Sequence, residues 1–188
     1  MNYKDKIEPV GHLQIIRVNS DNSQEILLDD HNIITAGMGR SLAAMFSHED
    51  KTDSFDHFTI PYFQIGDGTH TMVSSLTSLA SPLSIAEYGS EDVTLSAVKV
   101  SDDPVGDDQA VIAMHPAYIY LSASNKVTYS VTIDESTANT IDITEVGLFS
   151  KNPYLQTPPV AYLCAYRSFA EIPKRNSYTL IFNWTIEF

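Results

Sequence analysis

The amino-acid sequence predicts a mainly β fold, an antiparallel β-sandwich or jelly roll of roughly eight strands with one helix near residues 36–47. Several segments alternate apolar and polar residues, which is the period of a strand with one buried face. Stretches rich in Gly, Pro, Asn, Asp and Ser separate these segments and are typical of turns. Strands do not alternate with long helical segments, so nothing favours a parallel sheet.

The first part of the chain predicts a hairpin followed by the helix. Two β-like runs at 12–18 and 25–30 flank a polar turn, the arrangement of two antiparallel strands. Apolar residues then recur at helical spacing from Met38 to Phe46, with Thr35 or Ser41 as a possible N-cap. We expect this to be the one long helix.

The middle of the chain predicts strands joined by long loops. Segment 58–65 has strand character, and Pro61 confines it to a sheet edge or a bulge. A strong turn at 66–69 ends it. Residues 70–90 predict an extended packed loop, and 92–100 predicts a further strand. The remaining strands are expected at 110–121 with a break at Pro116, at 126–133, at 139–150, at 160–169 and at 178–188.

The last of these segments has the most regular alternation in the chain. Its large apolar residues are expected to form one buried row of the structural core: Tyr178, Leu180, Phe182, Trp184, Ile186 and Phe188. Chain ends fray unless packing holds them. The strand that carries the only Trp is therefore expected to lie in the centre of the sheet.

Length and composition predict one domain over 12–188, preceded by an N-terminal arm over 1–11. The formal net charge of −13 leaves no basic stripe, which argues against a nucleic-acid partner. No apolar run is long enough to span a bilayer and the start of the chain lacks a signal-peptide core, so we expect no membrane partner and folding in a cytoplasm. Cys164 is the only cysteine and is expected to be a small buried hydrophobic residue.

Two blocks of sequence contain four short motifs: an N-x-I-x-x-x-G segment that leads into a helix, an I-G-x-G-T turn, an E-x-G-L-F strand, and a final hairpin ending L-x-x-x-W-x-I-x-F. Their positions are Asn32, Ile34 and Gly37; Ile65, Gly66, Gly68 and Thr69; Glu145, Gly147, Leu148 and Phe149; and Leu180, Trp184, Ile186 and Phe188. In this order and spacing the motifs resemble those of a group of tailed-bacteriophage virion proteins found among tail-fibre, baseplate and neck components. The segment 84–126 has no matching motif.

The resemblance implies a non-enzymatic structural protein of the virion, made in the host cytoplasm and assembled in several copies with other phage structural proteins. The N-terminal arm and the loops at 47–57, 101–109 and 151–159 are the expected contact segments. A capsid decoration or head-fibre protein is an alternative on the same scaffold. A carbohydrate-binding module, in which Trp184 and tyrosines stack on sugars, is an alternative of a different class.

The residues themselves favour folding roles for the matching glycines. Gly66 and Gly68 suit a turn with positive φ, and Gly147 suits a bulge or a close backbone approach. Asn32 can bond its own backbone at the corner between strand and helix. The segment 66–69 superficially resembles a phosphate-binding loop, but no helix and no Lys follow, so a hairpin-type turn is the simpler interpretation.

Three acidic clusters are candidates for metal or acid–base chemistry, although we expect no cofactor. His31 with Asp29 and Asp30 forms the first, and solvated residues at a hairpin end are the alternative. A candidate calcium loop contains Asp102, Asp103, Asp107 and Asp108, without EF-hand spacing. A third cluster contains His48, Glu49, Asp50, Asp53, Asp56 and His57, for which a solvated loop is the default interpretation.

Tyrosines are the remaining functional signal. Tyr is favoured at protein interfaces, because one end is apolar and the other forms hydrogen bonds, but it is also simply common in strands. Both interpretations apply to Tyr118, Tyr120, Tyr129, Tyr154, Tyr162 and Tyr166. Exposed strand edges are a second expected mode of association.

Overall fold

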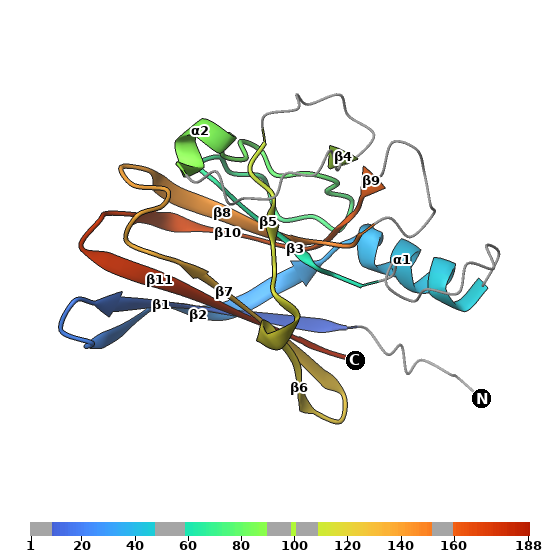
Figure 1. Ribbon diagram of the computed structural model, residues 1–188. Coiled ribbons are helices and arrows are strands. Elements are labelled where there is room, and N and C mark those ends of the chain that lie inside the picture. The colour runs from blue at the N-terminus through green and yellow to red at the C-terminus, as the bar shows by residue number, and fades with distance from the viewer. Residues whose placement is uncertain (1–8, 48–58, 90–98, 101–108, 152–159) are drawn as a thin grey trace.

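The computed structural model describes residues 9–47, 59–89, 99–100, 109–151 and 160–188. This part of the chain is mainly β, with nine strands in one antiparallel sheet that curls into a half-barrel (Figure 1). In spatial order the strands are β5 (Ile112–Ala113), β3 (Tyr62–Gly66), β8 (Asp142–Phe149), β10 (Leu163–Pro173), β2 (Gln24–Ile34), β1 (Val10–Asn19), β11 (Tyr178–Glu187), β7 (Lys126–Ile133) and β6 (Ile119–Ala123). A separate parallel pair joins β4 (Lys99–Val100) to β9 (Val160–Ala161).

The predicted antiparallel β fold is confirmed, but the arrangement expected of a sandwich, two separate sheets, is not what the described residues form. Strand β2 belongs to both halves of one continuous sheet. It pairs with β1 as far as Asn32 and then with β10 at Ile33 and Ile34. One strand therefore joins a half built on β1, β11, β7 and β6 to a half built on β10, β8, β3 and β5.

Both halves contribute to one apolar core. Leu13 and Ile15 of β1 face it, as do Phe63 and Ile65 of β3, and all four are almost completely buried. The rings of Phe63 and Phe182 lie 5.2 Å apart across the interior, which joins β3 to β11 although the two strands are not neighbours in the sheet. Burial of apolar surface between the two halves stabilises the curl.

Strand β11 is central, as predicted, because it pairs with β1 on one side and with β7 on the other. Tyr178, Leu180, Phe182, Trp184 and Ile186 are buried, which confirms five positions of the expected row. Phe188 is 40% exposed, so its assignment to the core was wrong. The strand ends at Glu187. Beyond it, the amide of Phe188 donates a hydrogen bond to the carbonyl of Asn125 in the neighbouring turn.

The predicted helix is confirmed as α1 (Ala36–Ser47), the longer of the two α-helices in the described residues. The short α2 (Ile85–Tyr88) lies within the segment expected to be loop, and a capping box between Ser84 and Glu87 begins it. Neither described helix is long and apolar enough to cross a membrane.

Helix α1 is held against β10 rather than capped in the predicted way. The Thr35 hydroxyl donates to the Leu163 carbonyl, and the Ser41 hydroxyl lies 3.9 Å from the thiol of Cys164. Cys164 is fully buried, as expected, and burial raises the pKa of its thiol to about 11. The β8–β10 register shifts between Leu163 and Ala165, so the helix packs on an irregular point of the sheet.

Other boundaries differ from the predictions in small ways. Strand β1 begins at Val10, so the last two residues of the expected arm belong to the sheet. Pro61 precedes β3 and does not interrupt it. The expected break at Pro116 is confirmed, because the short 3-10 helix η2 (Pro116–Tyr118) separates β5 from β6.

The two glycines of α1 provide a matched test of this packing. A Cβ at Gly37 would lie 2.0 Å from the Leu163 carbonyl oxygen, whereas a Cβ at Gly39 would meet nothing within 4 Å. We expect Gly37→Ala to displace the helix from β10 and destabilise the fold by about 2 kcal/mol or more. We expect Gly39→Ala to stabilise it by about 0.5–1 kcal/mol, because Ala favours helix. Urea denaturation of both variants measures the change in the free energy of unfolding. Equal changes would contradict the close contact between Gly37 and Leu163.

Candidate functional site

The most highly organised polar group in the described residues is the buried carboxylate of Glu145 on β8. It accepts hydrogen bonds from the amides of Ala80 (3.0 Å) and Ser81 (2.7 Å) and from the hydroxyl of Tyr166 (2.8 Å). Glu145 and Tyr166 are both fully buried. The carboxylate thus joins β8, β10 and the loop before α2.

The same cluster continues through Tyr166 to the loop after β3. The phenol oxygen of Tyr166 accepts a hydrogen bond of 2.9 Å from the amide of His70. Burial raises the pKa of Tyr166 to about 12, and the neighbouring Glu145 contributes to the rise. Every contact in the cluster holds two segments of the chain together, and the carboxylate does not face either of the grooves described below.

Gly66 lies beside this carboxylate and Gly68 lies against the Ser81 backbone that the carboxylate binds, but neither glycine has the predicted role. Neither Gly66 nor Gly68 has a positive φ; of the described glycines only Gly89 does. A Cβ at Gly66 would lie 2.4 Å from the Ser81 carbonyl oxygen, and one at Gly68 would lie 2.7 Å from the Ser81 amide. Both positions require glycine because the loop at Ser81 passes against the backbone.

Gly147 follows the second of its two predicted roles, close approach. A Cβ there would lie 2.7 Å from the Leu79 side chain and 2.8 Å from that of Leu163. Gly147 pairs in regular register with Gln64 and Tyr166, so there is no bulge at this residue.

A second polar contact joins the two motifs at opposite ends of the chain. The indole of Trp184 donates to the side-chain oxygen of Asn32 at 2.8 Å, and the Asn32 amide donates to the Ile33 carbonyl at 2.9 Å. The second bond is the predicted contact of Asn32 with its own backbone. The first was missed, since nothing in the local sequence connects residues so far apart.

The candidate cluster is divided between the two faces of β2: Asp29 and His31 lie on one face, where both contact His12, and Asp30 lies on the other. Asp29 pairs with His12 (2.7 Å), whereas Asp30 forms an ion pair with Arg167. Alternation along β2 sends adjacent side chains to opposite faces. The hydrogen bond from the His31 amide lowers the pKa of Asp30, and Arg167 lowers it further. These residues are exposed and lie within β2 rather than at a hairpin end.

The other candidate metal ligands lie outside the described residues. These are Asp102, Asp103, Asp107 and Asp108 of the expected calcium loop, and His48, Glu49, Asp50, Asp53, Asp56 and His57 of the third cluster. Within the described part of the chain, no group of three His, Cys, Asp or Glu side chains is close enough to hold a metal ion.

The tyrosines divide between core and surface. Tyr129, Tyr162 and Tyr166 are buried, which supports their interpretation as strand residues. Tyr118 and Tyr120 are 59% and 50% exposed, and Tyr154 lies outside the described residues. The surface interpretation therefore applies to Tyr118, directly before β6, and to Tyr120 within it.

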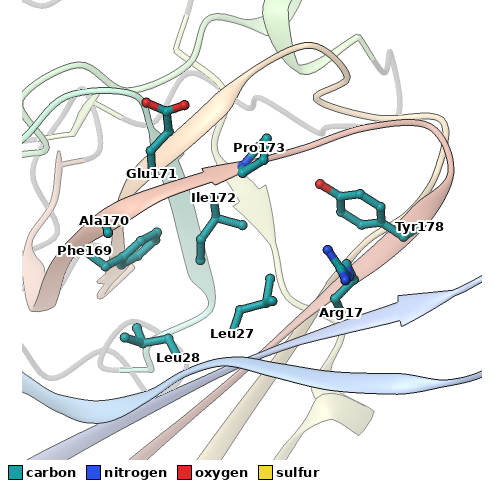
Figure 2. A pocket seen from close by; sticks show the side chains of 9 residues that line it. All are labelled: Arg17, Leu27, Leu28, Phe169, Ala170, Glu171, Ile172, Pro173 and Tyr178. Carbon is teal, nitrogen blue, oxygen red and sulfur yellow. The ribbon is translucent and has the colours of Figure 1, made fainter.

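A groove of about 230 Å³ opens where β2 and β10 separate beyond their short pairing (Figure 2). Leu27, Leu28 and Ile172 give it an apolar floor, and Ile172 points toward Leu27, while the Glu171 carboxylate points away. The guanidinium of Arg17 lies 5.5 Å from the centre of the Tyr178 ring at one end. The groove suits a short apolar side chain more than a catalytic reaction, since Arg17 already forms an ion pair with Glu25.

A larger groove of about 490 Å³ lies between α1 and the strands at the C-terminal end of β11. Its lining is mostly apolar and includes Met38, Leu42, Ile60, Ile119, Tyr129 and Phe188. We call it the α1–β6 groove. Its character is that of a contact surface, because it is broad, open and poor in groups that could react.

Comparisons of the chain with protein families, with curated proteins and with solved structures found no match.

The Glu145 cluster predicts a specific stability loss. Replacing Glu145 with Gln turns an acceptor of three hydrogen bonds into a group with one acceptor oxygen, so at least one buried donor loses its partner. We expect Glu145→Gln to lower the free energy of unfolding by about 2–4 kcal/mol. Glu171→Gln, an exposed carboxylate on β10, is the control and should change it by less than about 0.5 kcal/mol. Chemical denaturation of both variants measures the free energy of unfolding, and equal values for the two would contradict the role of Glu145.

Tyr166 predicts a loss of stability at alkaline pH. Its folded-state pKa, about 12, lies above the ordinary value of 10.0, so the fold favours the neutral phenol. This contribution is fully present below pH 10 and is lost as the pH rises from 10 to 12. Tyr166→Phe should therefore make the stability less dependent on pH in that window than it is in the wild type. Thermal unfolding across the window measures this, and parallel pH curves for the two proteins would count against it.

Proposed function

We propose that this chain is a non-enzymatic structural protein of a tailed-bacteriophage particle, a component of the tail, baseplate or fibre-attachment region. In this proposal it is made in the host cytoplasm, becomes part of the virion, and assembles in several copies with other phage structural proteins. Neither nucleic acid nor a membrane is a proposed partner.

The observation that carries the proposal is the set of packing contacts made by the residues whose motifs resemble those of virion proteins. They lie far apart in sequence but meet in pairs: Asn32 with Trp184, and Gly66 with Glu145. Gly37 likewise lies directly against the Leu163 backbone. Each pair fixes how two segments pack, and none presents a reactive group to a groove, so these motifs serve a scaffold.

The finer interpretation of the fold belongs to the same proposal. We infer that the two halves of the curled sheet act as the two layers of a sandwich, because they share one core and, among the described strands, β2 is the one that pairs with both. Such a scaffold would present its loops and edges to neighbouring subunits. A capsid decoration or head-fibre protein would use the same scaffold and remains the alternative within this class.

The carbohydrate-binding alternative is weakened by the position of Trp184. The indole is 1% exposed and its Nε1 donates to Asn32, so the ring cannot stack on a sugar without leaving the core. A blue tryptophan emission that resists quenchers and does not respond to glycans is expected. A glycan-dependent shift would favour sugar binding.

The proposal predicts that the chain is present in purified virions. Mass spectrometry of particles from a producing culture should find it in multiple copies per particle, and antibody labelling in negative stain should place it on the tail. Labelling of the head would favour the decoration alternative. Absence from particles that otherwise contain their full set of proteins would overturn the proposal.

A further inference from the structure

Strand β6 forms one edge of the nine-stranded sheet. It pairs with β7 on one side, and no strand of the described chain pairs with the other side. The residues from Tyr120 to Ala123 are exposed, and Leu121 reaches 73%. The β6–β7 hairpin also projects from the body of the sheet (Figure 1).

This edge has little of the protection that sheet edges usually carry. Natural edges are shortened, charged, interrupted by Pro, or twisted by bulges. The opposite edge strand, β5, is two residues long. β6 contains neither a charge nor a Pro, and its single irregularity is a register shift between Leu121 and Ala123. The regular part, Ile119–Leu121, can therefore accept another strand.

An apolar surface surrounds the free edge. We call Tyr118, Tyr120, Leu121 and Phe188 the β6 surface; they are 59%, 50%, 73% and 40% exposed. Ile119 and Leu121 are two positions apart, so both side chains lie on the face that bears the α1–β6 groove. Phe188 and Ile119 line that groove, which makes the β6 surface continuous with it.

The low charge of this region favours a second copy of the chain as the occupant. The chain carries a net charge of −13, yet residues 109–133 contain no Asp or Glu, and Lys126 is their one Lys or Arg. Lys126 is paired with Glu187 at 2.8 Å, so the region is close to neutral. A basic or acidic partner would find no complementary charge here. A second copy would meet an equally neutral surface, so a contact here would bring no unpaired like charges together although both chains are acidic.

We infer that the β6 surface is the contact between two copies of this chain, related by a two-fold axis, with the two β6 edges antiparallel. An edge strand is self-complementary in this arrangement, because each copy offers the same backbone groups and the same apolar side chains. The sheet would then continue from one copy into the next. The inference deepens the proposed function, since it names one interface through which the copies assemble.

Sedimentation equilibrium of the full chain over a range of concentration and salt tests the interface. We expect a monomer–dimer equilibrium that strengthens as salt rises, since salt screens the repulsion between the acidic chains. Leu121→Lys places two like charges at the contact and should raise the dissociation constant of the dimer by about tenfold or more. Ile26→Lys, at a residue of β2 that is 58% exposed, makes the same charge change away from β6 and should leave the constant unchanged.

Hydrogen exchange of the wild-type protein provides a readout that needs no variant. The amides of Ile119–Leu121 that face the free edge should exchange more slowly at high concentration than at low concentration. A chain that stays monomeric, a closed assembly larger than a dimer, equal effects of the two Lys variants, or exchange independent of concentration would each overturn the inference. A dimer that is absent from virions would overturn the proposed function alone, whereas a monomeric chain found in virions would overturn this interface alone.

Discussion

The fold depends on Asn32, because β2 must serve both halves of the sheet. Its last pair with β1 is Gly11 with Asn32, and its first pair with β10 is Ile33 with Tyr166. At this junction the indole of Trp184 holds the Asn32 side chain. Gly11 leaves room for it, since a Cβ there would lie 2.2 Å from the Asn32 amide. One polar side chain thus sets where the sheet changes partner and begins to curl.

Other buried polar groups also fix how distant segments of the chain are placed. Buried polar atoms are costly unless they form hydrogen bonds, and a satisfied network specifies one arrangement of the chain. Glu145 fixes the loop at Ala80 and Ser81, Thr35 fixes the start of α1 on Leu163, and Lys174 donates to Asn139. Burial lowers the pKa of Lys174, so its contacts also offset the cost of a cation in the interior. These buried hydrogen bonds hold distant segments in one arrangement and so make the scaffold rigid.

The chain is strongly acidic, but the region around β6 carries little charge, since residues 109–133 contain no Asp or Glu. Self-repulsion at −13 favours dispersed subunits, whereas the neutral, apolar region around β6 favours contact. The proposed assembly would use both properties, since repulsion keeps free copies apart and the apolar region supplies a contact. The balance between them depends on salt and concentration rather than on any reactive group.

The sequence by itself determined the strands, because alternation of apolar residues is a local signal. The period of two predicted β7, β11 and the hairpin of β1 and β2, and helical spacing predicted α1 over its observed range. The same signal failed at Phe188, which keeps the alternation of β11 but lies one residue beyond its last strand pair. Local pattern shows which side chains share a face; it does not show where the neighbouring strands end.

The tertiary structure alone decided what depends on contacts between distant residues. The division of β2 between β1 and β10, the bond from Trp184 to Asn32 and the loop passing Gly66 join segments that share no local pattern. The same holds for the surface: Tyr129 and Tyr120 have equal propensity for strands, yet one is buried and the other lies on a free edge. Burial depends on which strand pairs with which, and pairing is settled only when the whole sheet has formed.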